Sequence, residues 1–542
     1  MEDVVSKDNR SITRPASKVM LGGGLALVGG LASNIIVAAL FGAGANMDAY
    51  LTAMVVPSYF QIIFYSSLSF VFMPAFIEAE AKHGEADAWA LVGTFFWLTA
   101  IVLLLLSIFG SLFSTAIIHA LAPGFQGEKA VLASQMLAIL FFTTPFVGLS
   151  TLTMGIQNAR NRFFWPSFAP ALGSLGNVIV LLLFSSFLGP LTLCWGYLIS
   201  ILLQAAITVI PVLSHGWKKT LPLNDARIGN LGRLMLPLIL LGMLISFSPL
   251  AERYFSSVLP DGQIAYMGYA NKISSIFVVF LASGIASAIF PSMARTYTQE
   301  GITGLSKKND FGLLLTLAVA LPAVLIVGAL AVPLTSLFFE RGAFQPADTL
   351  GVSQIVFAFM LSNVLLRMMG NIFQRSLYVL KDTITQPIVD SVFVVLFIIT
   401  ARFFVTQWGY VGLVWAGVLR NGLSALVLWA LLILKFPRTN LSQMFVSIVK
   451  YSGAALIAFI GGRLAVVLLA NFPSIVQLIF GGLLSSGLYL GILAFLDREM
   501  LISILELVGI QYLLNKFPQF GDYLFQRKPG QVEGVTDESH HI

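Results

Sequence analysis

Charged side chains stand inside several of the long apolar stretches of this 542-residue chain. Lys272 lies in the middle of one stretch and Asp390 lies in another. Because a charge at the centre of a membrane-spanning helix costs about 2.5 to 3.5 kcal/mol, such a side chain is expected to face a polar cavity. An ammonium group there can bind phosphate, and a carboxylate can bind a cation. Lys272 is therefore predicted to bind phosphate, with a snorkelling or structurally paired lysine as the alternative.

A second pair of charged residues, Glu252 and Arg253, lies near the outer end of another apolar stretch. Neighbouring residues point about 100° apart on a helix, so these two side chains cannot face the same direction. Arg253 is predicted to line the outer part of a cavity and Glu252 to assist cation coupling, unless the two form a plain interfacial pair. Asp390 is predicted either to pair with an arginine or to bind a coupling cation.

Motifs for hydrolytic, nucleotide-dependent or redox chemistry do not occur in the sequence. There is no Gly-Lys-Ser/Thr phosphate loop, and the five histidines and the single cysteine, Cys194, form no metal-spaced set. We therefore expect no enzymatic activity, no cofactor and no metal site. A membrane glycosyltransferase, ligase or polymerase would need a catalytic carboxylate or histidine in a sizeable outer loop, and the predicted outer loops are short.

The elements that position these residues are predicted to be membrane-spanning helices. Hydrophobic residues make up 57% of the chain and charged residues only 10%, whereas soluble domains carry about 25% charged residues. Long apolar runs recur along the chain, and helices satisfy their own backbone hydrogen bonds in lipid. The alternating pattern of a membrane barrel does not occur. Fourteen spans are predicted, at residues 19–41, 49–76, 88–118, 131–156, 167–188, 191–214, 234–259, 264–293, 311–338, 348–372, 385–408, 410–434, 451–470 and 474–496.

Lysine and arginine are concentrated in the loops on one side of the membrane. The other side has only Lys129 and Arg341 in its loops, and Arg253 near the end of a span. The positive-inside rule then places both termini in the cytoplasm. The net charge of +6 is scattered over short loops, so nucleic acid is not an expected partner. Four cations of the inside loops lie after the fourth and tenth spans: Arg160, Arg162, Arg375 and Lys381. They either guide anionic headgroups to a cytoplasmic entrance or simply obey this rule.

An internal repeat divides the chain. Pro74 and Pro291 close the second and eighth spans, Pro166 and Pro387 open the fifth and eleventh, and the offset along the chain is nearly the same for both pairs. Six helices are therefore predicted to occur twice in the same orientation, with a substrate bound between the halves. The predicted regions are a cytoplasmic tail at 1–18, a first lobe at 19–214, a cytoplasmic linker at 215–233, a second lobe at 234–434, a helix pair at 435–496, and an interfacial helix with a cytoplasmic tail at 497–542.

Several short motifs form a recognisable series. They are Phe41-Gly42-Ala43-Gly44 with Asp48-Ala49-Tyr50, Ala122-Pro123-Gly124-Phe125, Asn161-Arg162-Phe163 with Pro166 and Phe168-Ala169-Pro170, Gly342-Ala343-Phe344 with Asp348, and Leu377-Tyr378 with Asp382-Thr383. On these residues the chain resembles the MurJ/MviN lipid II flippases, from about residue 20 to residue 500. The resemblance implies the fold of the multidrug/oligosaccharidyl-lipid/polysaccharide exporters: two six-helix lobes around a central cavity, and a helix pair that forms a groove for an undecaprenyl tail.

The first lobe departs from the charge pattern of that family. The family's cavity arginines, which meet the substrate pyrophosphate, fall here on Leu27, Ser33 and Gln61, and an acidic neighbour becomes Asn34. The resemblance implies that Gln61 and Asn34 still line the substrate cavity. Asp48 matches an acidic position of the family and is a candidate cavity residue, although an Asp at a helix start also acts as an N-cap.

The eighth span also has fewer charged residues than the family pattern. The family's Asp-Arg pair appears as Asn271-Lys272, and the acidic residue just beyond is Ser275. The resemblance implies that Asn271 and Lys272 bind the substrate. Fewer cations face a multiply anionic headgroup than the family pattern provides, so the substrate is expected to be lipid II or a different lipid-linked glycan.

Taken with the resemblance, the sequence predicts an all-α inner-membrane flippase that works by alternating access and takes part in peptidoglycan or polysaccharide biogenesis. Its expected partners are a lipid-linked glycan and membrane lipids, and it is expected to be a monomer without a cofactor, coupled to the membrane potential, Na⁺ or H⁺. The alternative is a cation-coupled multidrug exporter on the same fold.

Overall fold

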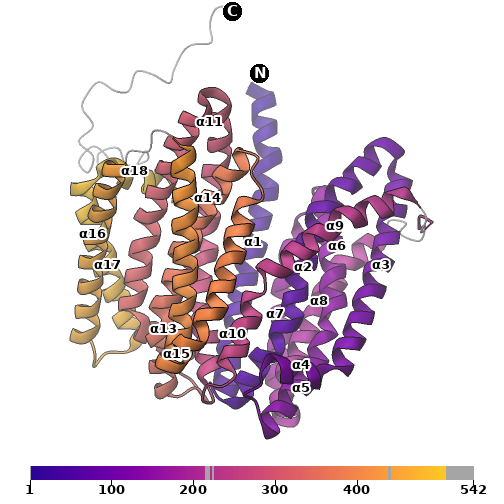
Figure 1. Ribbon diagram of the computed structural model, residues 1–542, viewed down its shortest axis with the longest axis horizontal. Coiled ribbons are helices and arrows are strands. Elements are labelled where there is room, and N and C mark those ends of the chain that lie inside the picture. The colour runs from indigo at the N-terminus through magenta and orange to yellow at the C-terminus, as the bar shows by residue number, and fades with distance from the viewer. Residues whose placement is uncertain (1, 214–219, 223–224, 437–440, 508–542) are drawn as a thin grey trace, which may run out of the picture.

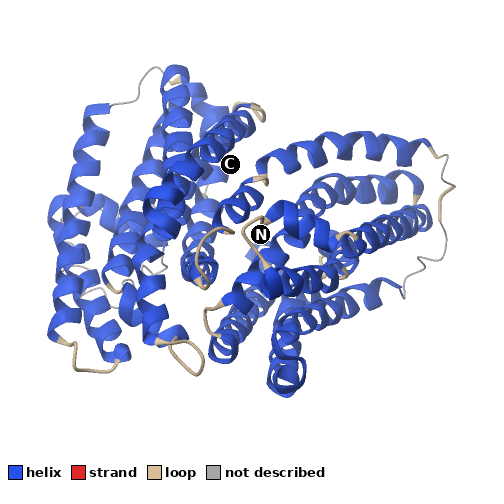
Figure 2. Cartoon of the chain, turned by 60° about the horizontal axis from the view of Figure 1, so that its bottom comes forward, coloured by secondary structure: helices blue, strands red, loops and turns tan. Residues whose placement is uncertain are grey.

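The computed structural model describes residues 2–213, 220–222, 225–436 and 441–507. Helices make up nearly all of this part of the chain, and no strand is assigned within it (Figure 2). The first half contains α1 (Glu2–Phe41), α2 (Ala45–His83), α3 (Glu85–Leu112), α4 (Ser114–Leu121), α5 (Gly127–Phe141), α6 (Thr143–Ala159), α7 (Phe164–Leu188), the short 3₁₀ turn η1 (Gly189–Leu191) and α8 (Thr192–Leu213).

The second half repeats this arrangement with longer elements. It contains α9 (Ala226–Ile245), α10 (Ser248–Ser256), α11 (Gln263–Ala329), α12 (Ala331–Phe339), α13 (Pro346–Phe359), the π-helical segment η2 (Met360–Leu366), α14 (Arg367–Val379) and α15 (Thr385–Lys435). The helix pair α16 (Leu441–Leu468) and α17 (Ser474–Leu496) follows, and then the short helix α18 (Arg498–Leu507). Residues 508–542, which include most of the predicted interfacial helix and tail, lie outside the described residues.

Backbone conformation confirms the internal repeat. Left-handed residues, which have a positive φ angle, recur at matching positions of the two halves: Gly42 and Gly262, Gly84 and Gly301, Asn161 and Lys381, Gly189 and Gly409. The offset along the chain is nearly constant for these four pairs, and it agrees with the offset between the paired prolines. Glycine is favoured where φ is positive, because a side chain would clash with the backbone there. Equivalent helix ends therefore use the same turn in both halves, as expected of two pseudo-symmetric lobes.

The number of helical segments is compatible with fourteen crossings. Ten segments of the described residues are long and apolar enough to cross a membrane. Two of them, 164–213 and 385–435, each contain two predicted spans separated by a left-handed glycine. The helices α2 and α9–α10, which are not among the ten, cover the predicted spans at 49–76 and 234–259. The helix α1 begins at Glu2, so the segment predicted as a tail continues the first span as helix.

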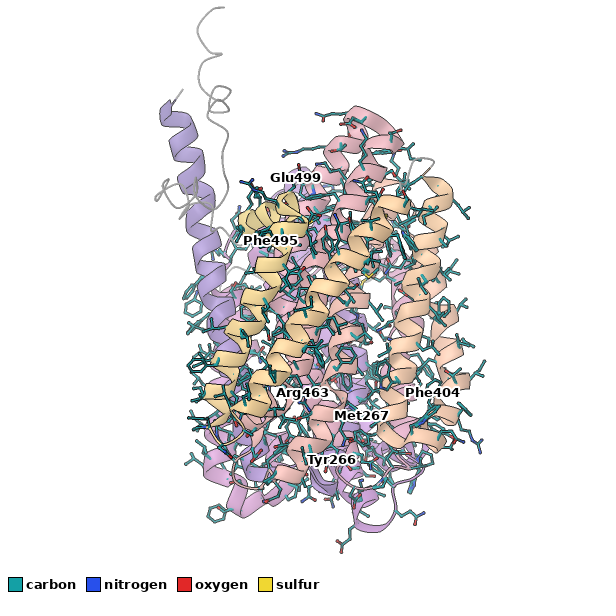
Figure 3. All side chains as sticks on the ribbon, turned by 90° about the vertical axis from the view of Figure 1, so that its left-hand side faces the viewer. Tyr266, Met267, Phe404, Arg463, Phe495 and Glu499 are labelled. Atoms are coloured by element: carbon teal, nitrogen blue, oxygen red, sulfur yellow. The ribbon has the colours of Figure 1, made fainter. Side chains whose placement is uncertain are left out.

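The two lobes lie side by side and meet at one end (Figure 1). Helices α2–α8 form one group and α11–α15 the other, with α16 packed on α11 and α17 packed on α16. The groups come together near α4, α5 and α10, and they spread apart towards the end where α1 begins. Figure 3 shows Phe495 of α17 and Glu499 of α18 towards that open end, and Tyr266 at the opposite end.

Large apolar side chains cover the outside of the bundle. Leu112, Phe187 and Phe495 are 74%, 84% and 93% exposed. Such exposure would be unfavourable in water, but acyl chains solvate these side chains without cost. Polar and charged side chains consequently gather between helices, where the candidate site lies.

Candidate functional site

Asp48 connects the two lobes at the end where they meet. Its side chain is fully buried and accepts hydrogen bonds from the backbone N–H groups of Gly262 and Ala265, each at 2.8 Å. Lys129 donates to the same carboxylate at 3.0 Å and also to Asp261 at 2.7 Å. Asp48 therefore caps the first turn of α11 in the other lobe, where a carboxylate is favoured by the helix dipole.

The backbones of the two lobes also touch at this end. The N–H of Ala343 donates to the carbonyl of Ala39 at 2.8 Å, and the hydroxyl of Tyr269 donates to the carbonyl of Gly42 at 2.8 Å. Gly342 has a φ of 60°, and a Cβ placed on it would lie 2.3 Å from the carbonyl oxygen of Ala39. Only glycine fits such an approach, so this end of the molecule is tightly closed.

A polar cavity of about 450 Å³ lies inside the second lobe. The helices α10, α11, α14 and α15 form its walls, together with η2 and the turn between α9 and α10. Among the described residues that line it, Ile62 on α2 is the one contributed by the first lobe. The cavity therefore lies mainly within the second lobe, next to its contact with the first lobe.

Five charged residues line this cavity: Glu252, Arg253, Arg367, Asp390 and Arg420. Arg420 already has partners, because its guanidinium donates to Ser248 of α10 and to the Asn421 side chain at 2.8 Å. It also lies 5.7 Å from the centre of the Phe397 ring. Asp390 accepts a hydrogen bond from Ser424 at 2.6 Å. These contacts hold α10 and α15 together around the cavity.

The other two arginines keep donors available. The Nη1 atom of Arg253 is buried and has no hydrogen-bond partner among the described residues. Arg367 is exposed, and no ion pair of the described residues includes it. Amide side chains lie beside them, with Asn363 donating to Asn271 at 2.9 Å. The wall can therefore offer guanidinium and amide donors to one anion.

Part of this set coincides with residues that were predicted from the sequence. Arg253, Asn271, Glu252 and Asp390 were predicted at the site, and all four line the cavity. Arg367 and Arg420 line the cavity as well. The cavity-facing position of Arg367 follows directly after the π-helical segment η2. A π-helical turn rotates the residues after it relative to α-helical spacing, so periodicity could not predict this direction.

Four predicted cavity residues do not line the cavity, and each has another partner. Lys272 on α11 donates to the Asn34 side-chain oxygen on α1. Gln61 donates to Thr143 at 3.2 Å inside the first lobe. Asp48 belongs to the closed end described above. Lys272 and Asn34 therefore join α11 to α1 at the seam between the lobes.

Two of the four predicted cytoplasmic entrance residues have partners within the protein. Arg160 forms ion pairs with Glu80 at 2.7 Å and Glu85 at 2.6 Å, and it lies 4.9 Å from the Trp89 ring. Arg375 lies 5.5 Å from the Phe290 ring. These contacts give Arg160 and Arg375 a structural role at the ends of α6 and α14.

Lys381 and Arg162 belong to the two matching turns of the repeat. Lys381 takes a left-handed conformation, as its counterpart Asn161 does, and Arg162 follows Asn161 and is exposed. Their positions fit the positive-inside rule, and their role at an entrance stays a prediction.

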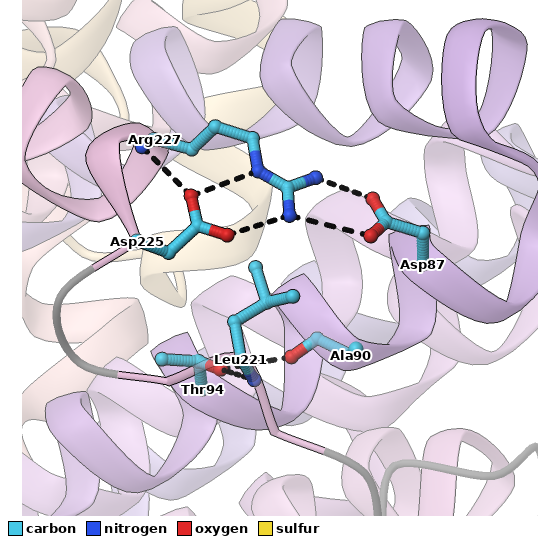
Figure 4. Close-up of polar contacts among 6 residues, drawn as sticks. All are labelled: Asp87, Ala90, Thr94, Leu221, Asp225 and Arg227. Atoms are coloured by element: carbon cyan, nitrogen blue, oxygen red, sulfur yellow. Dashed lines mark hydrogen bonds and ion pairs between the residues drawn. The ribbon is translucent and has the colours of Figure 1, made fainter.

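The start of α9 is fastened to α3 of the first lobe (Figure 4). Arg227 forms ion pairs with Asp87 at 2.5 Å and Asp225 at 2.7 Å, and the N–H of Leu221 donates to Thr94 at 2.7 Å. Hydrogen bonds from Arg227 lower the pKa of Asp225 to about 2. Since α10 is bonded to α15, the segment α9–α10 bridges the two lobes.

Comparisons with known proteins agree with this architecture. The family model of the lipid II flippase MurJ matches residues 37–480. The probable lipid II flippase MurJ of Bdellovibrio bacteriovorus is 26% identical over 84% of this chain and 88% of its own length. That of Buchnera aphidicola from Acyrthosiphon pisum is 28% identical over 64% of this chain and 69% of its own length.

Solved structures show the same fold. A lipid II flippase MurJ in an inward closed conformation has a TM-score of 0.75, is 20% identical, and covers 89% of this chain and 99% of its own. An inward-facing multidrug resistance MATE transporter has a TM-score of 0.64, is 16% identical, and covers 76% of this chain and 94% of its own. At this identity the second likeness shows the fold alone, so the multidrug alternative is not supported.

The family match covers most of the chain and both lobes. Its members are transporters rather than enzymes, and the apolar helices together with the bacterial relatives make the chain a multi-pass bacterial inner-membrane protein. The chain belongs to the lipid II flippase MurJ family.

Proposed function

We propose that the chain moves an undecaprenyl-pyrophosphate-linked glycan, lipid II or a related lipid-linked sugar, from the cytoplasmic to the outer leaflet. The observation that carries this proposal is the family match over residues 37–480, which includes every wall of the cavity. The relatives are named as lipid II flippases, and lipid II is a precursor of peptidoglycan. The protein would thereby serve cell-wall synthesis and cell shape.

Alternating access fits the arrangement of the lobes. The lobes are bonded at the end that carries Asp48 and Gly342, and they diverge at the end where α1 begins (Figure 1). If both termini are cytoplasmic, this arrangement opens towards the substrate leaflet. The head would enter between the lobes while the lipid tail stays in the bilayer beside α16 and α17. We propose that a monomer suffices, because the cavity walls come from one chain.

The proposal is tested in a bacterium depleted of its own lipid II flippase. Expression of the chain should restore growth and cell shape, and labelled lipid II in proteoliposomes should become accessible in the opposite leaflet. Failure in both assays, with the protein present in the membrane, would contradict a lipid II substrate. Transport of another lipid-linked glycan in the same vesicles would identify the related sugar instead.

Lys272 is proposed to bind phosphate once its bond to Asn34 opens. The ammonium group lies at the seam, one residue from Asn271 in the cavity wall. A hydrogen bond to a charged group contributes about 1.5 to 3 kcal/mol, so Lys272→Ala should slow transport by about tenfold or more. Initial rates in proteoliposomes measure this, at matched protein content. Unchanged transport would assign Lys272 to helix packing alone.

Coupling to an ion is proposed to involve Glu252 and Asp390, which both line the cavity. Each carboxylate can hold Na⁺ or a proton next to the anionic head. If Glu252 binds the coupling ion, Glu252→Gln should remove the dependence of transport on the Na⁺ or proton gradient. The measurement compares rates with each gradient imposed. Coupling by the membrane potential alone would leave the two proteins with equal gradient dependence.

A further inference from the structure

The cavity in the second lobe has hydrogen-bond donors that the described part of the protein does not use. The Nη1 atom of Arg253 is buried without a partner, and it belongs to a residue that lines this cavity. A buried donor left unsatisfied is costly, about 1 to 3 kcal/mol and more for a charged group. A ligand with acceptor atoms in the cavity would remove this cost.

Arg367 supplies a second cation, from a different helix of the same lobe. It begins α14 directly after η2, and it is exposed where it lines the cavity. Segments of π-helix inside α-helices frequently mark functional sites. Asn271 lies in the same wall and adds an amide donor, whereas Asn363 already donates to Asn271 and Ser274.

The charges of the cavity favour an anion. Three arginines and two carboxylates line it, which leaves one excess positive charge. Arg420 is held by Ser248 and Asn421 and lies within electrostatic reach of Glu252 and Asp390. Arg253 is within electrostatic reach of Glu252 as well, and Arg367 lies within reach of Arg420, so the three arginines share the excess. A volume of about 450 Å³ is in the usual range for a small-molecule site.

We propose that Arg253 and Arg367 bind the diphosphate of the lipid-linked substrate inside the second lobe. This inference rests on the proposed function and names the part of the protein that holds the head. The guanidinium groups would each bind phosphate oxygens through paired N–H donors, and the Asn271 amide would complete the contact. The first lobe, which contributes Ile62 to the cavity, would serve as the moving wall.

Binding measurements on the purified full-length protein test this assignment. Undecaprenyl diphosphate is the main probe, and inorganic diphosphate and phosphatidylglycerol are the two others. We expect Arg253→Gln and Arg367→Gln each to weaken undecaprenyl diphosphate binding by about tenfold or more. Inorganic diphosphate should compete with the main probe, because the site binds the diphosphate itself, whereas phosphatidylglycerol should not.

Two further arginines of the second half serve as matched controls. Arg402 on α15 and Arg463 on α16 are exposed and do not line the cavity, and Figure 3 shows Arg463 on the outer helix pair. Arg402→Gln and Arg463→Gln should bind as the unchanged protein does. Arg253→Lys and Arg367→Lys keep the charge and should bind more tightly than the Gln variants, which separates loss of the site from misfolding.

The outcomes distinguish this inference from the proposed function. Normal binding and transport by both Gln variants, with transport by the unchanged protein, would overturn the site and leave the flippase function standing. Equal weakening by the control variants would also overturn it. If the unchanged protein neither binds undecaprenyl diphosphate nor transports lipid II, the proposed function itself fails.

Discussion

Asp48→Ala is expected to lower the free energy of unfolding by about 3 to 5 kcal/mol and to stop transport. The substitution leaves Lys129, which is largely buried, without its buried partner. It also removes the acceptor of the Gly262 and Ala265 N–H groups at the start of α11. Thermal unfolding in detergent measures the first effect, and lipid II accessibility in proteoliposomes measures the second.

Asp261→Asn provides the matched control for this prediction. Asp261 binds the same Lys129, but its side chain is 65% exposed. An exposed ion pair contributes about 0 to 1 kcal/mol, so this substitution should have a small effect. Equal losses for both variants would mean that the charge of Lys129, and not the cap on α11, decides the stability of the closed end.

Asp48 also shows what local sequence rules cannot predict. An Asp at the start of an apolar helix predicts an N-cap on that same helix. The carboxylate instead caps α11, which lies in the other half of the chain, because the two lobes bring these helix starts together. The residues around Asp48 give no indication that it bonds to α11, because this contact depends on tertiary packing.

The fold was largely predictable because only a few kinds of backbone structure can span a lipid bilayer. Apolar runs must be helical in the membrane, and paired prolines at nearly constant offset indicated the repeat. The structure confirms the repeat at residues that the sequence had not paired in this way, such as Asn161 and Lys381. A left-handed conformation at a residue other than glycine cannot be recognised from one sequence. The pairing of Asn161 with Lys381 therefore became visible only from the backbone angles of the structure.

The structure places some of the predicted site residues at the cavity and others elsewhere. Charged residues within apolar stretches pointed to Arg253 and Asp390, which both line the cavity, since a polar cavity makes such positions tolerable. The family pattern pointed instead to Gln61 and Asn34, which bond elsewhere. Assigning roles by matching family positions assumes that the charged residues lie on the same helices as in the family. In this chain the arginines that line the cavity lie on α10, α14 and α15 instead.

Gly342→Ala is expected to prevent closure of the end where the two lobes meet and to reduce transport by more than tenfold. Two costs act together at this position. A left-handed conformation costs a residue with a side chain about 1 to 2 kcal/mol. The added Cβ would also lie 2.3 Å from the carbonyl oxygen of Ala39, which is backbone and cannot turn away. The lobes must separate at this point, and the Ala343 to Ala39 hydrogen bond is lost.

Gly127→Ala separates these two costs, because Gly127 has a similar φ of 55° and nothing within 4 Å of a Cβ placed on it. It should therefore show the backbone cost alone, as a modest loss of thermal stability with transport retained. Accessibility of the end where the lobes meet, measured by labelling of a cysteine introduced beside Ala343, should rise in Gly342→Ala and stay unchanged in Gly127→Ala. Equal labelling and equal transport in the two variants would show that the lobes need no close backbone contact to complete the transport cycle.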